Sequence, residues 1–480
     1  MDSRTFVKSL PIAFVSLSAA ALLIAGCTSA LTSSNGTNPA VETGPAFVVG
    51  TDAPLASVLS FSVQVENICA VPASTGNPSS TAIPCVPLLS GTPTVDFARF
   101  NGLQTLLDMN DVPVGNYSQI QVTLGSATIG YLNVPASGAP TIVTEAGTYP
   151  SSASTYTYTA NLASPLVVTK AGTPVGLRVD FDLRKSVQVD NSGNFTGQVT
   201  PTFNIGAVGT GDAGGYIDTF DASVVSVNTT AQSFVVQGPH GEQFTINVNG
   251  STEWENGDSL SSLTTSSIVQ VSGTLDKADS TLDADDVAIL SQNGFYAAGQ
   301  VTYVQPASGQ ATSFDLYVRG LLPTTTGITL GQIAQVDLNG NEKFFIYWMH
   351  NPMTEFLFNS SQMLPGQHVS VGGPASGAAN ANAVTVNRVV LRHWGFNGTV
   401  VPGSMSTSSG TFQMQITGFA GLLVPQTVTV YTASPTVFRN GLTGLSSVPA
   451  STNVRVVGLL LKDPTSGKTV LLAHYVDALT

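Results

Sequence analysis

Charged residues are scarce in this sequence. Lys, Arg, Asp and Glu supply only 9% of the 480 residues, and the 29 acidic residues outnumber the 16 basic ones, for a formal net charge of −13. A surface of that sign repels a phosphate backbone, and no cluster of Lys and Arg offsets it, so nucleic-acid binding is not expected. Periodic arrays of Ala, Leu, Glu and Lys, which long helices need, are also missing.

Short apolar runs take the place of helical periodicity. Val, Ile, Thr, Phe and Tyr recur in short stretches divided by Asn, Pro, Ser and 47 glycines, a pattern typical of all-β proteins. A chain of this length favours roughly two to four domains. We therefore predict an all-β fold with several domains.

Cysteine is nearly absent, and one of the three cysteines, Cys27, follows an apolar run. The run spans 10–25 and is preceded by Arg4 and Lys8, an arrangement typical of secretory signal peptides and short for a membrane span. The letters LIAGC that end at Cys27 resemble the bacterial lipobox, in which lipid is attached to the cysteine and the preceding residues are removed. The resemblance implies a signal peptide over 1–26 and a lipid anchor at Cys27. A plain signal peptide or an uncleaved anchor is the alternative.

The segment after Cys27 is polar. Residues 28–44 consist mainly of Ser, Thr, Asn, Gly and Pro, and such a composition cannot bury enough apolar surface to offset chain entropy, so a flexible tether is predicted over 27–45. Thr28 stands where an Asp would favour retention at the inner membrane in the Gram-negative sorting rule. By that resemblance the protein is expected in the bacterial cell envelope, lipid-anchored at the outer membrane and either periplasmic or surface-exposed.

Cys69 and Cys85 are the remaining cysteines. Thiols oxidise outside the cytoplasm, and with Cys27 lipidated the remaining count is even, so a Cys69–Cys85 disulfide is predicted. It would close a loop of about sixteen residues and contribute on the order of 3 kcal/mol through loop entropy. Two free buried thiols are the alternative.

The first half of the mature chain alternates apolar and polar residues in the manner of half-buried strands. Three motifs accompany this pattern: TDAP at 51–54, VPVGNYSQIQVTL at 112–124 and VDFDLRKSV at 179–187. They are similar to landmarks of a domain-of-unknown-function family of bacterial and archaeal envelope lipoproteins. The resemblance implies one β-sandwich domain, prealbumin- or Ig-like, over 46–208, and it implies no activity.

The second half contains three similar units, predicted at 216–292, 295–393 and 394–480. Each has a Val-rich strand, a Phe-containing strand, a Thr followed by an aromatic residue, a Val-x-Val-x-Gly strand and an apolar closing strand. The matching residues are Phe234, Phe314 and Phe412; Thr252, Thr354 and Thr436 with Trp254, Phe356 and Phe438; and Gly273, Gly373 and Gly458. Short strands that close on themselves predict three small β-barrels, with the three phenylalanines at equivalent buried sites.

This repeat pattern resembles a second uncharacterised family, of bacterial envelope repeats with an OB-like barrel. The resemblance implies that the three predicted barrels are OB-like. A chance alignment of Val-rich strands is the alternative.

Short motifs that suggest catalysis lack their partners. Residues 257–260 spell GDSL, a hydrolase motif whose Ser259 would need a histidine base in an Asp-x-x-His block, and no histidine has an Asp three residues earlier. The SGKT at 466–469 lacks the first glycine of a phosphate-binding loop. The acidic stretches at 276–286 and 337–342 lack calcium-loop spacing, and the histidines make no zinc pattern. No catalytic residue, metal or cofactor is therefore predicted.

These observations favour a non-catalytic envelope lipoprotein that binds a glycan, another polymer or an envelope protein, or that acts as a spacer. An extracytoplasmic hydrolase with an unrecognised site and OB-type nucleic-acid binding are the alternatives, and the net charge opposes the second. If a glycan is bound, aromatic rings that stack on sugar faces are the natural contacts, and Tyr347, Trp348 and Trp394 are the candidates. A buried core position is the alternative for each of them.

Overall fold

The computed structural model describes the chain from residue 41 onward, with gaps. The described ranges are 41–53, 58–73, 85–100, 103, 105–135, 137–170, 174–190, 195–209, 216–238, 243–275, 281–323, 326–346, 353, 355–378, 384–419 and 422–479. Cys27 lies outside these ranges, together with the predicted signal peptide and most of the tether, and so do Tyr347 and Trp348. Glu42–Thr480 form one compact unit.

Strands dominate this unit, so the all-β prediction is confirmed. Within the described ranges α1 (Leu183–Ser186) is the one α-helix. No helix in the described part of the chain has the length and apolar character needed to cross a membrane.

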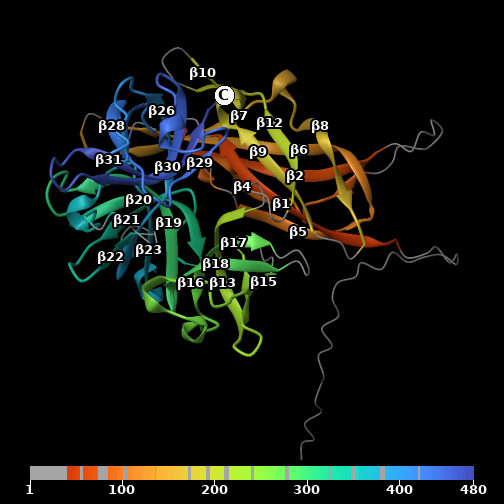
Figure 1. Ribbon diagram of the computed structural model, residues 1–480, viewed down its shortest axis with the longest axis horizontal. Helices are drawn as coiled ribbons and strands as arrows, with labels where there is room; N and C mark the ends of the chain where they lie inside the picture. The colour runs from red at the N-terminus through yellow and green to blue at the C-terminus, as the bar shows by residue number, and fades with distance from the viewer. Residues whose placement is uncertain are drawn as a thin grey trace, which may run out of the picture. The chain divides into compact units, whose positions relative to one another are not determined.

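Two β-sheets make up the first part of the unit, which we call the sandwich (Figure 1). One sheet has the strand order β12 (Phe203–Gly209), β9 (Val175–Asp182), β1 (Thr43–Ala53) and β5 (Thr105–Pro113). The other has the order β3 (Val86–Pro87), β2 (Ser60–Pro72), β6 (Gly115–Asn133) and β7 (Thr141–Gly147), with β4 (Thr94–Asp96) paired to β2 and β8 (Tyr156–Val168) paired to β6. A short hairpin, β10 (Val187–Val189) with β11 (Phe195–Val199), completes this part.

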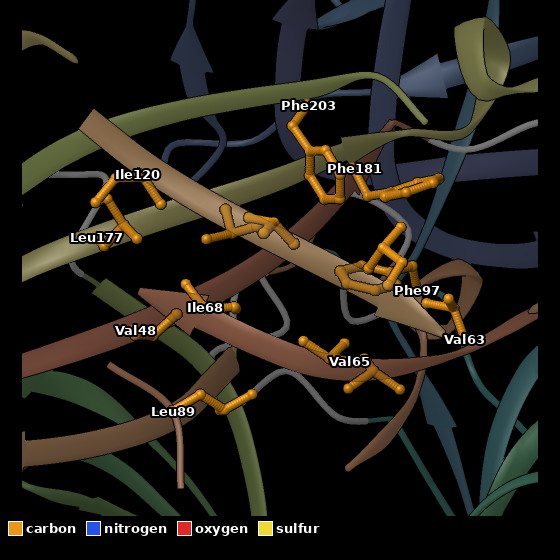
Figure 2. Close-up of a cluster of buried hydrophobic side chains, with 14 of the residues drawn as sticks. Val48, Val63, Val65, Ile68, Leu89, Phe97, Ile120, Leu177, Phe181 and Phe203 are labelled. Carbon is orange, nitrogen blue, oxygen red and sulfur yellow. The ribbon is translucent and has the colours of Figure 1, made fainter. Parts of the chain in front are cut away.

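The two sheets of the sandwich share one hydrophobic core (Figure 2). Alternate residues of β2, β6 and β9 point into it, as the apolar–polar alternation predicts. Val65 from β2, Ile120 from β6 and Phe181 from β9 are at most 1% exposed. The ring centroid of Phe181 lies 4.9 Å from that of Phe61 and 5.0 Å from that of Phe97. Burial of each such side chain contributes roughly 1.5–3 kcal/mol, so this core holds the two sheets face to face.

The predicted disulfide is confirmed. Cys69 of β2 is bonded to Cys85, which immediately precedes β3, and their Cα atoms are 5.5 Å apart. β2 and β3 pair beside the bond, with Cys69 opposite Pro87. The alternative of two free thiols is wrong.

Three further sheets follow along the chain. Barrel 1 has the order β15 (Gln243–Asn247), β14 (Ser233–Gln237), β13 (Tyr216–Asn228), β17 (Ile268–Leu275), β18 (Leu282–Ser291) and β16 (Glu253–Trp254). Barrel 2 has β22 (Lys343–Ile346), β25 (Arg388–Arg392), β23 (His368–Pro374), β19 (Gly294–Gln305), β20 (Ser313–Leu322), β21 (Ile333–Asp337) and β24 (Val384–Thr385). Barrel 3 has β28 (Gln426–Tyr431), β27 (Thr411–Ile416), β26 (Trp394–Val400), β30 (Asn453–Lys462), β31 (Thr469–Ala478) and β29 (Val437–Arg439).

A parallel strand pair closes each of these sheets into a barrel-like shape. The third strand of the unit pairs with the closing strand: β15 with β18, β21 with β24 and β28 with β31. In barrel 2 the closing strand is broken in two, because β24 and β25 are separated by residues 386 and 387. The three units therefore share one strand order.

The repeat phenylalanines occupy equivalent positions, as predicted. Phe234, Phe314 and Phe412 are each the second residue of the second strand of their barrel, and all are at most 1% exposed. Each stands opposite an apolar residue of the third strand: Ile246, Val336 and Val430 respectively.

The glycine that ends each Val-x-Val-x-Gly motif lies against the closing strand. A Cβ atom at Gly273, Gly373 or Gly458 would approach a backbone carbonyl oxygen of that strand to 2.1, 2.7 or 2.2 Å. In barrels 1 and 3 the corner threonine donates to the next carbonyl along the same strand. Thr252 Oγ1 lies 2.8 Å from the Ala284 oxygen, and Thr436 Oγ1 lies 2.7 Å from the Ala473 oxygen. The motif therefore recurs for two reasons. The glycine leaves room for the closing strand, and in barrels 1 and 3 the threonine forms a hydrogen bond to that strand.

The corner aromatic of barrel 2 was assigned wrongly from the sequence. In barrels 1 and 3 the corner aromatic, Trp254 or Phe438, pairs with a valine of the closing strand. That valine in turn lies opposite the second Val of the Val-x-Val-x-Gly motif. The residue in this register in barrel 2 is Phe344 of β22, whereas Phe356 is buried against Tyr431 of barrel 3, with ring centroids 5.1 Å apart. Extra residues between β22 and β23 shift the spacing that the sequence alignment relied on. Thr354 lies outside the described residues.

Candidate functional site

Trp394 is not an exposed ligand contact. It begins β26, and its side chain is 1% exposed. Its ring packs 4.6 Å from that of His368, and the guanidinium carbon of Arg319 lies 5.0 Å from its centroid. The proposed glycan contact at this position is therefore wrong, and the alternative of a core position is confirmed. Contacts at Tyr347 and Trp348 stay predictions, because the structure does not describe those residues.

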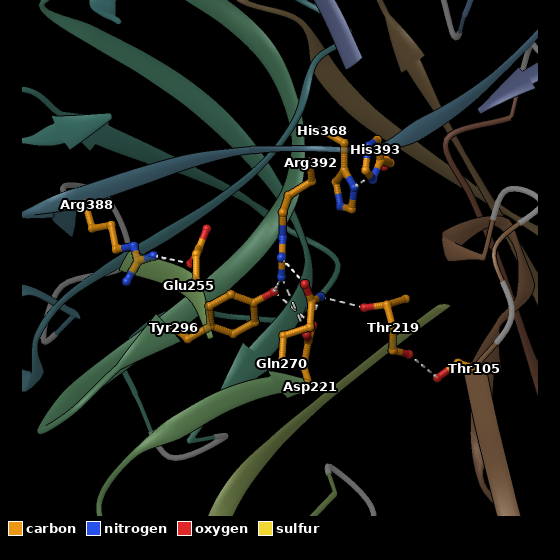
Figure 3. Close-up of polar contacts among 10 residues, drawn as sticks. All are labelled: Thr105, Thr219, Asp221, Glu255, Gln270, Tyr296, His368, Arg388, Arg392 and His393. Carbon is orange, nitrogen blue, oxygen red and sulfur yellow. Dashed lines mark hydrogen bonds and ion pairs between the residues drawn. The ribbon is translucent and has the colours of Figure 1, made fainter. Parts of the chain in front are cut away.

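The structure instead gathers buried polar residues where barrels 1 and 2 meet (Figure 3). Arg392, the last residue of β25, donates to the Tyr296 hydroxyl at 3.1 Å and to the Gln270 side-chain oxygen. Its guanidinium also lies 3.5 Å from Asp221 Oδ1. A buried cation is tolerated only when it is paired and hydrogen-bonded, and Asp221 supplies the anion.

Tyr296 and Gln270 in turn hold the carboxylate of Asp221. The Tyr296 hydroxyl donates to Asp221 Oδ2 at 2.8 Å, and Gln270 Nε2 donates to Oδ1 at 2.7 Å. Loss of solvent raises the pKa of Tyr296, so its hydroxyl keeps the proton that it donates. Gln270 extends the network to Thr219 Oγ1 at 2.5 Å, and the hydroxyl of Thr105, on β5 of the sandwich, donates to the Thr219 carbonyl at 3.0 Å. One polar chain therefore joins the sandwich, barrel 1 and barrel 2.

Two further arginines of barrel 2 reach other units. Arg388 on β25 donates to Glu255 Oε2 and to the Ile289 carbonyl of barrel 1, both at 2.6 Å. Desolvation lowers the pKa of Arg388, and the Glu255 carboxylate opposes that shift. Arg319 on β20 pairs with Asp96 of the sandwich at 3.3 Å and also donates to a sandwich carbonyl.

Barrel 3 is attached in the same way. The Tyr475 hydroxyl donates to Asp218 of barrel 1 at 2.7 Å, and the charge of that carboxylate adds to burial in raising the pKa of Tyr475. Gln367 of barrel 2 donates to the Leu460 carbonyl at 2.9 Å, and Lys462 Nζ donates to the Ser361 carbonyl at 2.7 Å. The four β units are thus fastened to one another by specific polar contacts.

Residues singled out as chemical candidates have structural roles in this arrangement. Ser259 caps a short 3₁₀ helix, and the partners of its hydroxyl are the hydroxyls of Ser261 and Ser262. Glu342 closes a turn by accepting from the Asn339 and Gly340 amides at 2.5 and 3.0 Å. Among the residues that the structure describes, no group of three or more His, Cys, Asp and Glu side chains could hold a metal ion.

The residues that join one β unit to another were not identified from the sequence, although one feature of the sequence indicated them. Arg388 and Arg392 flank the apolar run 389–391 within a closing strand, where arginine is unusual. In a chain so poor in charge, arginines inside apolar strands indicate paired burial.

The comparisons with known proteins cover the sandwich and barrel 1. Residues 46–196 match the model of a family described as "Domain of unknown function (DUF4382)". Residues 222–288 match that of a family described as "Domain of unknown function (DUF5666)". No curated protein matches the chain. Over these two stretches the chain is therefore similar to two families whose descriptions assign no activity.

Proposed function

We propose that the protein is a lipoprotein of the bacterial cell envelope, anchored in the outer membrane through lipid at Cys27. Residues 1–26 are its signal peptide. The tether begins at Cys27 and is shorter than the predicted 27–45, because β1 already starts at Thr43. The folded unit has a non-catalytic role: it presents a binding surface to a polysaccharide or to an envelope protein, or it holds other components apart.

The Cys69–Cys85 disulfide supports the compartment in this proposal. Structural disulfides persist in oxidising compartments outside the cytoplasm and are rare within it. A disulfide in a chain that begins with a basic head, an apolar run and a lipobox-like cysteine fits export better than a cytoplasmic location.

The observation that carries the proposed role is the set of buried ion pairs between units. Arg319–Asp96, Arg388–Glu255 and Arg392–Asp221 each join barrel 2 to another unit. Paired buried charges add little net stability, but each is satisfied in one orientation only, so they hold the units in a defined arrangement. A fixed array of β units suits a platform or spacer.

The strand order supports assigning the barrels to an OB-like class. An OB-fold is a five-stranded Greek-key barrel. Barrels 1 and 3 have five strands besides the short corner strand, β16 or β29, and in each the third strand closes against the last. We therefore include three OB-like repeats, at 216–292, 295–393 and 394–480, in the proposal. The net charge of −13 opposes nucleic acid as their ligand.

The anchor is tested by Cys27→Ala. The variant is expected to lose metabolic labelling with palmitate and to move from the membrane to the soluble fraction, because several acyl chains supply the membrane affinity. Thr37→Ala, in the same predicted tether, is the matched control and should stay with the membrane. If the wild-type protein takes up no label, or Cys27→Ala still sediments with membranes, the lipoprotein proposal is wrong.

The partner class is tested with the unanchored Cys27→Ala protein. It is incubated with insoluble cell-wall and extracellular polysaccharides, and the retained fraction is measured. If the glycan proposal holds, replacing Tyr347 and Trp348 together by Ala reduces retention, whereas Tyr303→Ala does not. Absence of retention on every polymer would remove polysaccharide from the proposal and leave a protein partner or a spacer role.

A further inference from the structure

All three histidines that the structure describes meet where barrel 2 passes into barrel 3. His393 is the single residue between β25 and β26. Its ring is stacked on that of His474, which lies on β31, with centroids 4.6 Å apart and an interplanar angle of 12°. His368 of β23 lies beside it (Figure 3), with Nδ1 3.3 Å from the His393 carbonyl oxygen. The connection between the two barrels is therefore built on imidazole contacts.

The contacts of these rings can all be made by neutral imidazoles. A carbonyl oxygen only accepts hydrogen bonds, so Nδ1 of His368 carries its hydrogen and Nε2 need not be protonated. Two parallel rings in contact, as in His393 and His474, would repel each other if both were charged.

The charged groups that face these rings are mostly cationic. Arg319 of β20, Arg392 of β25 and Arg99 of the sandwich act on His368; Arg392 and the other two histidines act on His393; Arg439 of β29 acts on His474. Three of these arginines are themselves paired with carboxylates: Arg319 with Asp96, Arg392 with Asp221 and Arg439 with Asp477. The arginines therefore disfavour an added positive charge on each ring.

Burial and these arginines lower all three pKa values. Burial is the larger cause in each case, and the pKa falls from 6.5 to about 3 for His368 and to about 4 for His474, and well below 6.5 for His393. If the contact between barrels 2 and 3 opens, the imidazoles regain solvent, their pKa values return toward 6.5 and they bind protons. The closed contact is therefore fully favoured above pH 6.5 and is weakened as the pH falls below that value.

We propose that His368, His393 and His474 form an acid-sensitive hinge, at which protonation of the imidazoles opens the contact between the start of barrel 3 and barrel 2. Trp394, which follows His393 and packs on His368, moves into solvent on opening. The inference does not depend on the lipid anchor or on the partner class.

The apolar part of the interface limits the opening to this end. Leu459, Leu461 and Leu472 of barrel 3 are fully buried in the same hydrophobic cluster as the core of barrel 2. These contacts do not titrate, so they keep the two barrels adjacent while the histidine end opens. A hinge motion, rather than dissociation of barrel 3, is the expected response.

The size of the effect follows from the number of protons bound. Each histidine that gains solvent on opening shifts the open-to-closed ratio by about tenfold per pH unit below about pH 6.5, until its closed-state pKa is reached. Three histidines together therefore shift it by up to about a thousandfold per pH unit. Such a steep dependence distinguishes this hinge from the titration of one group.

The test uses Trp394 as the reporter in the full-length protein. Trp254→Phe and Trp348→Phe leave Trp394 as the only tryptophan, and its emission is followed from pH 8 to pH 4.5. A red shift with an uptake of about three protons is expected, since opening exposes the ring to water. His368→Asn, His393→Asn or His474→Asn alone should reduce the uptake to about two protons, and the triple variant should abolish the transition.

Controls separate the hinge from general acid unfolding. His240→Asn and His350→Asn, which replace the two histidines outside the described ranges, should leave the transition unchanged, and near-ultraviolet circular dichroism at pH 8 checks that each variant is folded. If the triple variant does not fold, the proton uptake of the single variants decides the question. Constant Trp394 emission down to pH 4.5, or the same transition in the histidine variants, would overturn the proposal.

Discussion

Single residues matter most where a charge is buried. The chain has few charges, yet Arg319 and Arg392 are at most 5% exposed, and each has a carboxylate partner in another unit. Desolvating a guanidinium costs several kcal/mol, which only a close anion and complete hydrogen bonding offset. These residues consequently specify which surfaces meet more than they stabilise the fold.

Asp221→Asn is predicted to destabilise the protein strongly. The change removes the anion that faces the buried Arg392 guanidinium while it preserves the shape of the side chain, and the expected loss is about 3–5 kcal/mol. Asp315→Asn is the matched control, because desolvation alone raises the pKa of Asp315, so loss of its charge should change stability by less than about 0.5 kcal/mol. The urea unfolding midpoint is measured for both variants and for the unchanged protein. If the midpoint falls equally in Asp221→Asn and Asp315→Asn, the charge of Asp221 is not important for stability.

At the scale of strands and turns, close approach of backbones explains the repeated motif. The strand that carries the Val-x-Val-x-Gly motif in each barrel, and the first strand of barrels 2 and 3, come so near their neighbours that glycine stands there. A Cβ at Gly299 or Gly398, in the first strand, would lie 1.8 or 2.5 Å from a carbonyl oxygen of the second. The repeated glycines are thus set by strand separation rather than by turn geometry.

Gly458→Ala is predicted to disrupt the β30–β31 pair. The new methyl group would lie 2.2 Å from the Leu472 carbonyl oxygen, so the strands must separate at a cost of roughly 1–3 kcal/mol. Gly250→Ala places its methyl group in open space and should be neutral or stabilise by up to about 1 kcal/mol. Thermal unfolding of the two variants compares these cases. An equally stable Gly458→Ala protein would contradict the close approach.

At the scale of the whole molecule, the hydrophobic cores extend across units. Phe47 and Val49 of the sandwich belong to the same cluster as the core of barrel 1. Leu461 of β30 packs into the core of barrel 2, whereas Leu471 of β31 packs within that of barrel 3. Units that share cores are expected to unfold cooperatively, in contrast to domains separated by linkers.

Leu461→Ala is predicted to weaken two barrels at once. Truncation of a fully buried leucine costs about 2–5 kcal/mol, and at this position the cavity forms between barrels 2 and 3. Amide hydrogen exchange should therefore accelerate in β19–β25 as well as in β26–β31. Leu471→Ala, of equal size and burial, should accelerate exchange chiefly in barrel 3. Unchanged protection of barrel 2 in Leu461→Ala would show that the barrels are independent.

Much of the fold is predictable from the sequence because it depends on local pattern. Apolar–polar alternation indicates which residues face the interior of a sheet, and it identified the equivalent burial of Phe234, Phe314 and Phe412 correctly. With Cys27 set aside as the expected lipidation site, two cysteines remain, and that even count together with the expected compartment was enough to predict the Cys69–Cys85 bond. The assignment of Phe356 as the corner aromatic of barrel 2 relied on sequence spacing, and it was wrong because barrel 2 has extra residues between β22 and β23.

The candidate site was decided by tertiary structure alone. In β26 Trp394, Gly395 and Phe396 are all buried, so both faces of this strand are covered. Alternation predicts which face of a strand points inward, but it carries no information on which outer faces of separate units meet. The pairing of Arg392 with Asp221 and the stacking of His393 on His474 join residues far apart in sequence, and they arise only when barrel packs on barrel. For that physical reason, the sequence determined the units of this protein and only their packing determined the junctions between them.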